Sequence, residues 1–546
     1  MDSRPLCIPP IEVPHSPAVE PGGAAYNRLM PLTALRPATD RLAALLLACT
    51  LAPASLGAAT FTVDSTLDDP DQVTNGVCAS AAGDCTLRAA IQEANSTAGP
   101  AMDLISFAIP GGDPGCDGAG ICVIEITGVM PDILSPTTID GSSQPGNEDV
   151  CLLPIVARPA YKIVLDGDGT QPGLRPELNS NGSIIKGLNI RNFSDAVALI
   201  QTQLSVVQCN FIGTDETGTS AIPNTRNAVI LGCDADFNLI GGPSPADANL
   251  LSGNDIDGVQ MYGDIPCPAG GEPDDNTVQG NSIGLAKDGL TALGNGFSGV
   301  SIFGDDRFPA NNLILDNVIA ASSGAGVFIG DFIAGTEVQG NFIGTDPTGS
   351  VDLGNATGVY SEGDPGTLIG GPAEGDANVV AFSTFAGVVV GDFTNAGMGN
   401  TIQRNSIYAN GALGIDLGDD GATANDAGDA DSGANGLQNF PDIASVALGP
   451  ASFDVTYSVD STTPLTVEFF AAEAGEGRVF LGEDTYNGGS PTVMLATGTP
   501  GVQSIVGTAT DTDGNTSEFS MPATVPPIFS DGFESGDTSA WSTTVP

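Results

Sequence analysis

Six aspartates each follow a glycine at the end of a short segment of alternating apolar residues. They are Asp264, Asp305, Asp331, Asp364, Asp392 and Asp419. If equivalent segments stack on one another, these carboxylates form a column with a spacing of about 4.7 Å, the distance between neighbouring strands. Carboxylates this close raise each other's pKa or recruit a cation, and oxygen-rich clusters suit calcium. The pattern predicts a calcium-binding column, with ordinary Gly-Asp turn chemistry as the alternative.

A second acidic segment, from Asn425 to Gly433, contains Asp426, Asp429 and Asp431. Its alternation of carboxylates with small residues is typical of a calcium loop, although the spacing does not match a complete EF-hand. If this chain has a cofactor, we therefore expect calcium.

The strongest candidate for catalysis is Asp305-Asp306-Arg307, because it combines two carboxylates and a guanidinium directly after a strand. This cluster suits a polysaccharide lyase, whereas the alternative is an exposed ion pair of little energetic value. The single histidine, His15, precedes the predicted export signal, so the exported chain has no histidine base or nucleophile activator. The sequence also lacks the Gly-His-Gly and Arg-Ile-Lys segments of polygalacturonase-like enzymes. We therefore expect a protein that is not an enzyme, and otherwise a polysaccharide lyase or glycoside hydrolase.

The cysteines predict disulfides in an oxidising compartment. Of ten, Cys7 and Cys49 lie in or before the export signal, and the remaining eight are an even number. Zinc is the alternative, but no Cys-x-x-Cys spacing and no histidine support it. The proposed pairs are Cys78 with Cys85, Cys116 with Cys122, and Cys233 with Cys267, which leaves Cys151 and Cys209.

Seven short segments that end in glycine define the repeat on which these residues lie. Their β-branched residues alternate, which indicates strands and not helices. Successive segments begin roughly 27 to 41 residues apart, as expected for the coils of a β-solenoid, with a β-sandwich array as the alternative. The segments are Ala228–Gly232, Gly258–Asp264, Gly299–Asp305, Gly326–Asp331, Gly358–Asp364, Gly387–Asp392 and Gly414–Asp419.

A second repeat, Asn-x-apolar-x-x-Asn, runs between these segments, for example from Asn276 to Asn281 and from Asn312 to Asn317. Thr336 to Asn341 is a variant of it. Asparagine tolerates left-handed backbone and bonds locally, so that turn asparagines of successive coils can stack in a ladder. A longer unit, Asn-Phe-Ile-Gly-Thr-Asp-x-Thr-Gly, occurs at 210–218 and 341–349.

The composition narrows the possible partners. Asp and Glu total 66 against 15 Lys and Arg, a formal charge of −51. Such a charge argues against nucleic acid or an anionic membrane as partner and is compatible with cation binding. The hydrophobic fraction of 41% is ordinary for a folded protein.

The first residues predict export. Residues 30–59 have the pattern of a cleaved signal peptide, with the apolar run Leu42–Leu51 and cleavage before Thr60. Residues 1–29, proline-rich and without pattern, are interpreted as a non-native extension. No later stretch is long and apolar enough to span a bilayer, so we expect no transmembrane segment in the mature chain. The alternative is a lipoprotein anchored at Cys49.

The segment Cys85-Thr86-Leu87-Arg88-Ala89-Ala90-Ile91-Gln92-Glu93-Ala94-Asn95 resembles the N-terminal CSLREA-type motif of exported bacterial β-helix proteins, with Thr for Ser and Ala for Glu. The resemblance implies a right-handed parallel β-helix of the pectate-lyase-like superfold, secreted or at the cell surface. One face of the predicted helix is apolar and can cover the open end of the first coil, with Asp84 as its N-cap.

Beyond Phe440 the short repeats give way to longer segments in which apolar and polar residues alternate. These segments predict an immunoglobulin-like β-sandwich that caps the solenoid. The expected fold is therefore all-β: a right-handed parallel β-helix with a short N-terminal capping helix, then a sandwich. The expected regions are the N-terminal cap with the first coils at 60–180, β-helix repeats at 181–440, the sandwich at 441–523 and a tail at 524–546.

Long solenoids offer an extended lateral surface, so the predicted role is adhesion, or binding of a polysaccharide or other cell-surface polymer, without catalysis. The alternatives are the lyase or hydrolase described above and a structural matrix component that associates with itself. Tyr262, Phe303, Phe328 and Tyr360 lie on the repeated strands and could stack on sugars, but we expect most of them to pack in the interior.

Overall fold

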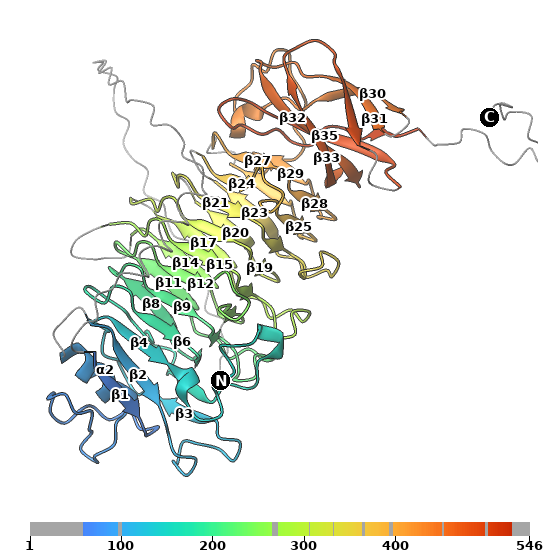
Figure 1. Ribbon diagram of the computed structural model, residues 1–546. Helices are drawn as coiled ribbons and strands as arrows, with labels where there is room; N and C mark the ends of the chain where they lie inside the picture. Colours follow the sequence, from blue (N-terminus) through green and yellow to red (C-terminus); the bar gives the residue numbers. More distant parts are fainter. Residues whose placement is uncertain are drawn as a thin grey trace, which may run out of the picture. The chain divides into compact units, whose positions relative to one another are not determined.

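The protein is a right-handed parallel β-helix followed by two antiparallel sheets, as seen in a computed structural model (Figure 1). The structure describes residues 58–96, 101–264, 271–304, 306–330, 332–362, 366–391, 397–449, 452–496 and 501–526. The described residues belong to one compact unit. The predicted fold class is therefore confirmed.

Three parallel sheets form the sides of the β-helix, and from β6 onwards each coil contributes one short strand to each side. The eleven-stranded sheet contains β1 (Thr60–Val63), β2 (Asp103–Phe107), β4 (Thr137–Asp140), β6 (Ile184–Lys186), β9 (Val206–Gln208), β12 (Leu239–Gly241), β15 (Thr277–Gln279), β18 (Leu313–Leu315), β21 (Glu337–Gln339), β24 (Leu368–Gly370) and β27 (Thr401–Gln403). The ten-stranded sheet contains β3 (Cys122–Glu125), β5 (Ile163–Asp166), β7 (Asn189–Arg191), β10 (Phe211–Ile212), β13 (Leu250–Leu251), β16 (Ser282–Ile283), β19 (Val318–Ile319), β22 (Phe342–Ile343), β25 (Val379–Ala381) and β28 (Ser406–Tyr408).

The third side, the eight-stranded sheet, collects all seven glycine-closed segments of the sequence. One further strand, β8, precedes them and lacks the closing glycine. The strands are β8 (Val197–Ile200), β11 (Val229–Gly232), β14 (Val259–Tyr262), β17 (Val300–Phe303), β20 (Ala325–Ile329), β23 (Thr357–Ser361), β26 (Val388–Val390) and β29 (Ile415–Leu417).

Aliphatic side chains fill the interior in register. Val259 pairs with Val300, and Val300 with Val327, and all three are fully buried. Burial of such a side chain stabilises the fold by about 1.5–3 kcal/mol. The small residue before each valine is required by packing, because a Cβ on Gly326 would lie 2.7 Å from the Ile343 side chain.

Buried asparagines join the coils, as the turn repeat predicted. In the main ladder each backbone amide donates to the Oδ1 of the next member at 2.9–3.1 Å, and each Nδ2 donates to the same oxygen. Its members are Asn210, Asn249, Asn281, Asn317, Asn341, Asn378 and Asn405. A second ladder joins Asn238, Asn276 and Asn312 in the same way. The next rung holds Thr336, which pairs in register after Asn312 and whose buried Oγ1 has no hydrogen-bond partner.

Helix α2 (Leu87–Ser96) lies at the N-terminal end and buries Leu87, Ala90, Ile91 and Ala94 against the first coil, as predicted (Figure 1). Its cap is not Asp84, because the Thr86 Oγ1 accepts the hydrogen bond from the Ala89 amide at 3.0 Å. In the described part of the chain, no helix is long and apolar enough to cross a membrane.

The polar residues of the CSLREA-like segment also have structural roles. The Arg88 guanidinium pairs with Asp68 at 2.8 Å. The Glu93 carboxylate accepts from the amides of Asn75 and Gly76, and the Asn95 side chain bonds the backbone of the next loop, at Asp132 and Leu134. The segment therefore ties the capping helix to the loops around it.

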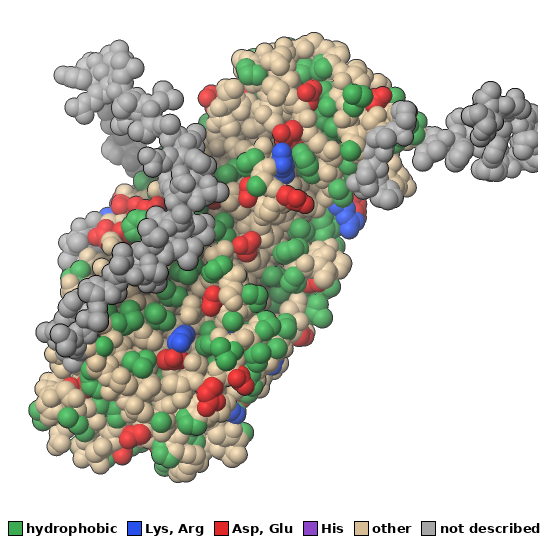
Figure 2. Space-filling model, in the orientation of Figure 1, with side chains coloured by type: hydrophobic (Ala, Val, Ile, Leu, Met, Phe, Trp, Pro, Cys, Tyr) green, Lys and Arg blue, Asp and Glu red, His purple; other side chains and the backbone are tan. Residues whose placement is uncertain are grey.

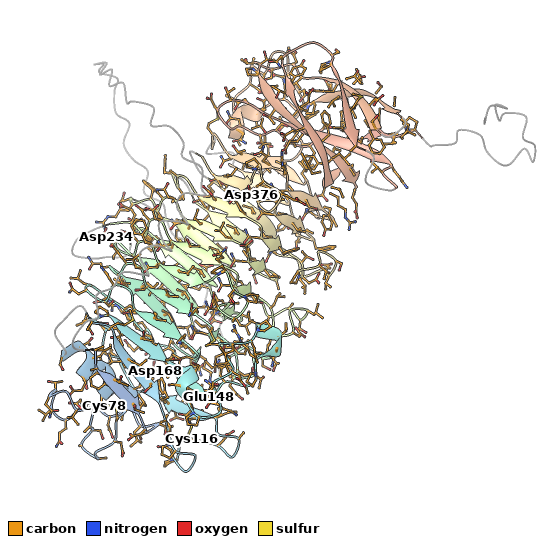
Figure 3. All side chains as sticks on the ribbon, in the orientation of Figure 1. Cys78, Cys116, Glu148, Asp168, Asp234 and Asp376 are labelled. Carbon is orange, nitrogen blue, oxygen red and sulfur yellow. A yellow bond between two sulfur atoms is a disulfide. The ribbon has the colours of Figure 1, made fainter. Side chains whose placement is uncertain are left out.

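Disulfides reinforce the N-terminal coils. Cys78–Cys85 and Cys116–Cys122 are the two local pairs that the spacing predicted, and Cys78 and Cys116 lie at the end that carries α2 (Figure 3). Cys151 and Cys209 form a third. Cys233 is also disulfide-bonded, while its predicted partner Cys267 lies outside the described residues.

The last described part consists of two antiparallel sheets that share a core. The strands of one are β30 (Asp442–Leu448), β31 (Ser452–Ser458) and β34 (Thr492–Ala496), and those of the other are β32 (Leu465–Glu473), β33 (Glu476–Tyr486), β35 (Ser504–Thr510) and β36 (Ala523–Thr524). Val455, Tyr457 and Phe469 lie fully buried between them. We call this part the sandwich; its likeness to immunoglobulin-like modules remains a prediction. Three short 3-10 helices complete the secondary structure of the described residues: Gly141–Ser143, Ile155–Ala157 and Ala434–Leu437.

Candidate functional site

The outer face of the eight-stranded sheet carries an unusual set of side chains. On β14, Val259 and Met261 belong to the interior core, so the alternation of the strand sends Gln260 and Tyr262 to the outer face. The pairing Tyr262 with Phe303 and Phe328 with Tyr360 then aligns aromatic rings from successive coils.

Four rings, Tyr262, Phe303, Phe328 and Tyr360, form what we call the aromatic row. Successive ring centroids are 4.9, 6.2 and 5.9 Å apart, and Phe328 and Tyr360 are stacked. All four side chains are half-buried and stand outside the interior core. The expectation that most of them pack inside is wrong, because the residue directly before each ring already takes the inward position. These inward residues are Met261, Ile302, Val327 and Val359.

A cavity of about 360 Å³, which we call the end pocket, lies at the Tyr262 end of the row. Its floor is apolar, and three charged side chains lie at its rim. The lining residues are Pro172, Arg175, Asp195, Ala198, Ile200, Arg226, Ile230 and Tyr262. Ala198, Ile200 and Ile230 are outward residues of β8 and β11, whereas Pro172 and Arg175 come from the irregular segment before β6.

Each cation of the end pocket faces a carboxylate. The Arg226 Nη1 lies 3.9 Å from the Asp195 Oδ2, and Arg175 pairs with Glu177 and lies 3.7 Å from Asp132. Burial raises the pKa of Asp195, although the Arg226 charge and a hydrogen bond from Asn227 oppose this. Burial likewise raises the pKa of Glu177, against the charge of Arg175.

A buried polar network continues from Asp195 along the edge of the sheet. The Asn227 Nδ2 donates to Asp195 at 2.8 Å and to the Gln260 Oε1 at 3.3 Å, and the Gln260 amide donates to Asp257 at 2.9 Å. Asp257 also accepts from the Ser301 hydroxyl at 2.7 Å. Burial raises the pKa of Asp257, which is inaccessible to solvent and therefore serves the network and not a ligand.

Neither the network nor the end pocket was predicted from the sequence. One signal was available for the network: Asp195, Asn227, Asp257 and Ser298 each stand two residues before the first valine of a strand in the eight-stranded sheet. No comparable signal predicts the pocket, because Arg175 comes from a segment without repeat.

The predicted carboxylate column can be followed only in part. Asp264 and Asp419 are described, whereas Asp305, Asp331, Asp364 and Asp392 lie outside the described residues. The Asp419 Oδ2 lies 3.5 Å from the Tyr360 hydroxyl, which donates to it. The strand register shows that the aspartates are not all equivalent, since Asp264 stands three residues beyond Met261 and Asp419 only two beyond the corresponding Leu417. The column as a calcium site remains a prediction.

The Asp305-Asp306-Arg307 cluster is likewise described only in part, since Asp305 lies outside. The Asp306 amide donates to the Asp264 Oδ2 at 3.0 Å, which connects the loops of two successive coils. This contact gives Asp264 a structural role. No described contact brings Asp306 and Arg307 together as a catalytic pair.

Asp426, Asp429 and Asp431, which we call the acidic loop, do come together. Each offers a carboxylate oxygen within 4.8 Å of the others, so the three could hold a metal ion. Hydrogen bonds fix two of them: Asp429 accepts from the Asn439 amide at 2.8 Å and the Ser461 hydroxyl at 2.6 Å, and Asp426 accepts from the Ala430 amide. Burial, followed by the charges of Asp426 and Asp429, raises the pKa of Asp431.

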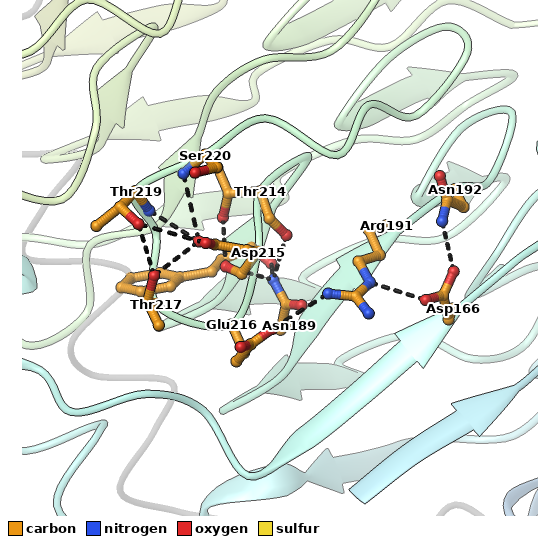
Figure 4. A network of polar contacts seen from close by, with 11 residues as sticks. Asp166, Asn189, Arg191, Asn192, Thr214, Asp215, Glu216, Thr217, Thr219 and Ser220 are labelled. Atoms are coloured by element: carbon orange, nitrogen blue, oxygen red, sulfur yellow. Dashed lines mark hydrogen bonds and ion pairs between the residues drawn. The ribbon is translucent and has the colours of Figure 1, made fainter. Parts of the chain in front are cut away.

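The Asn-Phe-Ile-Gly-Thr-Asp repeat is structural. In the first copy, Asp215 accepts from the Thr217 hydroxyl at 2.9 Å and the Thr219 amide at 2.8 Å, while Asn189 of the preceding coil donates to the Thr214 carbonyl (Figure 4). Beside this turn, Arg191 bridges Asp166 and Glu216 (Figure 4).

The second copy of the repeat builds the same turn around Asp346. Burial raises the pKa of Asp346, but hydrogen bonds from Thr348, Ser350 and Val351 outweigh it and lower the pKa to about 2. A carboxylate held in this way stabilises a turn and has no free oxygen to offer as a base.

Acidic side chains outnumber basic ones on the face shown in Figure 2, where Lys and Arg are isolated. This agrees with the total charge of −51. A polyanion therefore meets repulsion over most of this face.

No protein-family model and no curated protein matches the chain. Among solved structures, the A-module of the mannuronan C-5 epimerase AlgE4 of Azotobacter vinelandii is 14% identical, with a TM-score of 0.28, over 60% of this chain and 69% of that one. The Dettilon tailspike protein is 12% identical, with a TM-score of 0.29, over 79% and 87%. The catalytic unit of a GH87 α-1,3-glucanase from Streptomyces thermodiastaticus strain HF3-3 is 14% identical, with a TM-score of 0.29, over 58% of this chain and 50% of that one. Likeness at this level does not identify ligand-binding side chains.

Proposed function

We propose that the protein binds a polysaccharide, or another surface polymer of similar chemistry, along the outer face of its eight-stranded sheet and does not cleave it. The observation that carries the proposal is the aromatic row. Phe328 and Tyr360 present stacked, half-buried rings on the outer face of the eight-stranded sheet. Aromatic faces are rigid apolar platforms on which the C–H face of a sugar can pack.

The spacing of the row supports a polymeric ligand. Rings from four successive coils repeat at intervals of about 5–6 Å. A chain molecule that lies along the solenoid contacts several rings at once, and several weak contacts on one ligand add up to a useful affinity. The four rings come from one side of the β-helix, so they define one binding direction.

The proposed location is extracellular or at the cell surface. Three described disulfides, together with bonded Cys233, suit an oxidising compartment. Of the export signal proposed for residues 30–59, residues 30–57 lie outside the described residues. The proposed signal and the disulfides are consistent with each other, because a secreted chain meets oxidising conditions.

The test is a binding assay with a panel of soluble polysaccharides, followed by calorimetry on those that bind. We expect the triple variant Phe303→Ala, Phe328→Ala and Tyr360→Ala to lose binding, because it removes three of the four apolar platforms of the aromatic row. Met494→Ala is the control, since it removes an exposed apolar side chain of the sandwich. Unchanged binding by the triple variant at an unchanged melting temperature would refute the aromatic row as the site.

One observation favours an enzyme as the second candidate. Asp195, a carboxyl whose pKa is raised by burial, faces a cavity beside Arg226, and such a group can act as a general acid. The same polysaccharides are therefore also assayed for new reducing ends and ultraviolet-absorbing products. Products that vanish in Asp195→Asn would make the protein a lyase or hydrolase, whereas products that vanish only in Arg307→Ala would restore the cluster predicted from the sequence.

A further inference from the structure

We infer that the end pocket holds one uncharged sugar residue of the bound polymer and selects against uronic acids. This inference rests on the proposed function and adds the class of ligand. The pocket volume of about 360 Å³ lies in the range of small-molecule sites. The polymer would pass from the aromatic row into the end pocket at Tyr262, because this residue belongs to both.

The charges in and around the end pocket argue against an acidic ligand. Of the two guanidinium groups in the lining, that of Arg226 faces Asp195, which also lines the pocket. That of Arg175 faces Asp132 and Glu177, which lie outside the lining. A uronate would bring its carboxylate next to Asp195 in a partly desolvated site, where like charges repel strongly. The total charge of −51 adds a repulsion over longer range.

The chemistry of the lining suits hydroxyl groups. Ala198, Ile200 and Ile230 form an apolar floor on which the C–H face of a pyranose ring can lie. A sugar hydroxyl can donate to the Asp195 carboxylate and accept from the Arg226 guanidinium in the same place. The separation of 3.9 Å between these two groups is longer than a direct hydrogen bond, so a hydroxyl can approach both without first breaking a tight pair.

Asp195 is held in place for this role. Its Oδ1 accepts from the buried Asn227 amide, which fixes the carboxylate and leaves Oδ2 towards Arg226. The residue is 7% exposed, and its side chain reaches the cavity from the edge of the sheet. The network of Asn227, Gln260 and Asp257 therefore positions a group that contacts ligand.

The test compares neutral oligosaccharides of glucose, galactose and mannose with oligogalacturonate and oligomannuronate of the same length, by calorimetry at pH 7 and low salt. We expect at least one neutral oligosaccharide to bind about tenfold or more tightly than the acidic ones, a difference of about 1.4 kcal/mol. Arg226→Ala should weaken its binding about fivefold or more, the loss of one hydrogen bond to a charged group. Arg478→Ala, which removes another half-exposed and ion-paired arginine, is the matched control.

Asp195→Asn separates recognition from a merely structural role. It keeps an acceptor for Asn227 but removes the charge, so acidic oligosaccharides should gain affinity and the neutral-to-acidic ratio should fall. Tighter binding of acidic than of neutral oligosaccharides by the unmodified protein, or an unchanged ratio in Asp195→Asn, would overturn the inference and leave the aromatic row intact. If the triple aromatic variant abolishes polymer binding while Arg226→Ala changes no affinity, only the pocket is refuted. No binding of any saccharide would refute both proposals.

Discussion

Buried asparagines are the residues that hold one coil to the next. Asn317 accepts from the amide and from the side chain of Asn281, at 2.9 and 3.1 Å, and donates to the Val278 carbonyl at 2.8 Å. Its Nδ2 also donates to the Asn341 Oδ1 at 3.1 Å, so this fully buried side chain makes four hydrogen bonds. Because the side chain is inaccessible to solvent, water cannot easily replace these hydrogen bonds when it is removed.

We predict that Asn317→Ala lowers the free energy of unfolding by about 2–4 kcal/mol, because it leaves buried polar groups unpaired. Chemical denaturation measures the change. The control is Asn487→Ala, since Asn487 is exposed and bonds only the neighbouring Thr485 carbonyl among its described contacts. An equal loss in both variants would mean that the ladder contributes no more than a surface asparagine.

The interrupted second ladder allows a test in the opposite direction. Thr336 occupies the rung after Asn312, and its buried hydroxyl has no partner. In Thr336→Asn, the new Oδ1 would stand at the position where the Oδ1 of Asn276 and of Asn312 accept hydrogen bonds in the preceding coils. We therefore expect stabilisation of about 0.5–1.5 kcal/mol. Thr336→Val, which removes the hydroxyl without adding an acceptor, is the comparison. Thr336→Asn less stable than Thr336→Val would show that this rung cannot accommodate the larger side chain.

At the scale of elements, the acidic loop between β29 and β30 is the best-formed candidate for a metal. Its carboxylates approach within 4.8 Å, and the 3-10 helix Ala434–Leu437 connects it to β30, the first strand of the sandwich. Like charges held this close are unfavourable without a cation. Calcium bound at this loop would therefore stabilise the segment that joins the β-helix to the sandwich.

We predict that calcium raises the melting temperature and that the increase disappears in Asp426→Asn with Asp431→Asn. The combined variant Asp331→Ala, Asp364→Ala and Asp392→Ala tests the column predicted from the sequence. Differential scanning calorimetry with and without calcium gives the result, and magnesium controls for non-specific screening. A calcium effect lost only in the column variant would transfer the site to the column, and no calcium effect at all would refute both.

Strand positions could be predicted from the sequence wherever the repeat is regular. Glycine-closed segments such as Gly326–Asp331 predicted the strands of the eight-stranded sheet. In this segment Gly326 leaves room for the Ile343 side chain, and Val327 faces the interior core. β8 was missed because no glycine closes it. The end pocket could not be predicted, since it depends on a loop residue, Arg175, brought beside β8 by the path of the coil and not by any pattern.

At the scale of the whole molecule, the sandwich ends the β-helix with three buried glutamates. Glu468 accepts from the Arg404 amide at 2.9 Å, and Glu518 accepts from the amides of Leu417 and Thr423. Glu476 accepts from the backbone and side-chain amides of Asn410 at 3.1 and 3.0 Å, as a further asparagine of a ladder would. Each glutamate thus accepts hydrogen bonds from amides on a different side of the last coil.

The glutamates predict a particular pH dependence. Burial raises the pKa of Glu468 and of Glu518 to about 7, and burial also raises the pKa of Glu476. Nearby carboxylates add to this effect: Glu483 at Glu468, Asp416 and Asp420 at Glu518, and Glu473 at Glu476, while Arg404 opposes it at Glu468. A carboxyl whose pKa is higher in the folded state than in the unfolded state stabilises the fold at low pH.

The contribution is complete below the unfolded-state pKa, about 4.3 for glutamate, and is lost as the pH rises to about 7. We therefore predict that the free energy of unfolding falls across this window, with about 1–3 kcal/mol from Glu468. Glu468→Gln with Glu518→Gln should flatten the dependence and be more stable than the unmodified protein at pH 8. Denaturation at several pH values measures this, with the exposed Glu148→Gln as control (Figure 3). The same slope in the double variant would contradict the prediction.

The glutamate at the end of the ladder has a consequence for how such a chain can change in length. A coil in the middle of the stack, such as the one around Asn317, accepts from the preceding coil the same ladder hydrogen bonds that it donates to the next. Such a coil can therefore be duplicated or deleted, and its neighbours still pair. The terminal coils cannot, because one is fitted to α2 and the other to Glu468, Glu476 and Glu518. Variation in coil number should therefore occur between the two ends, and it would lengthen or shorten the outer face while the junctions stay the same.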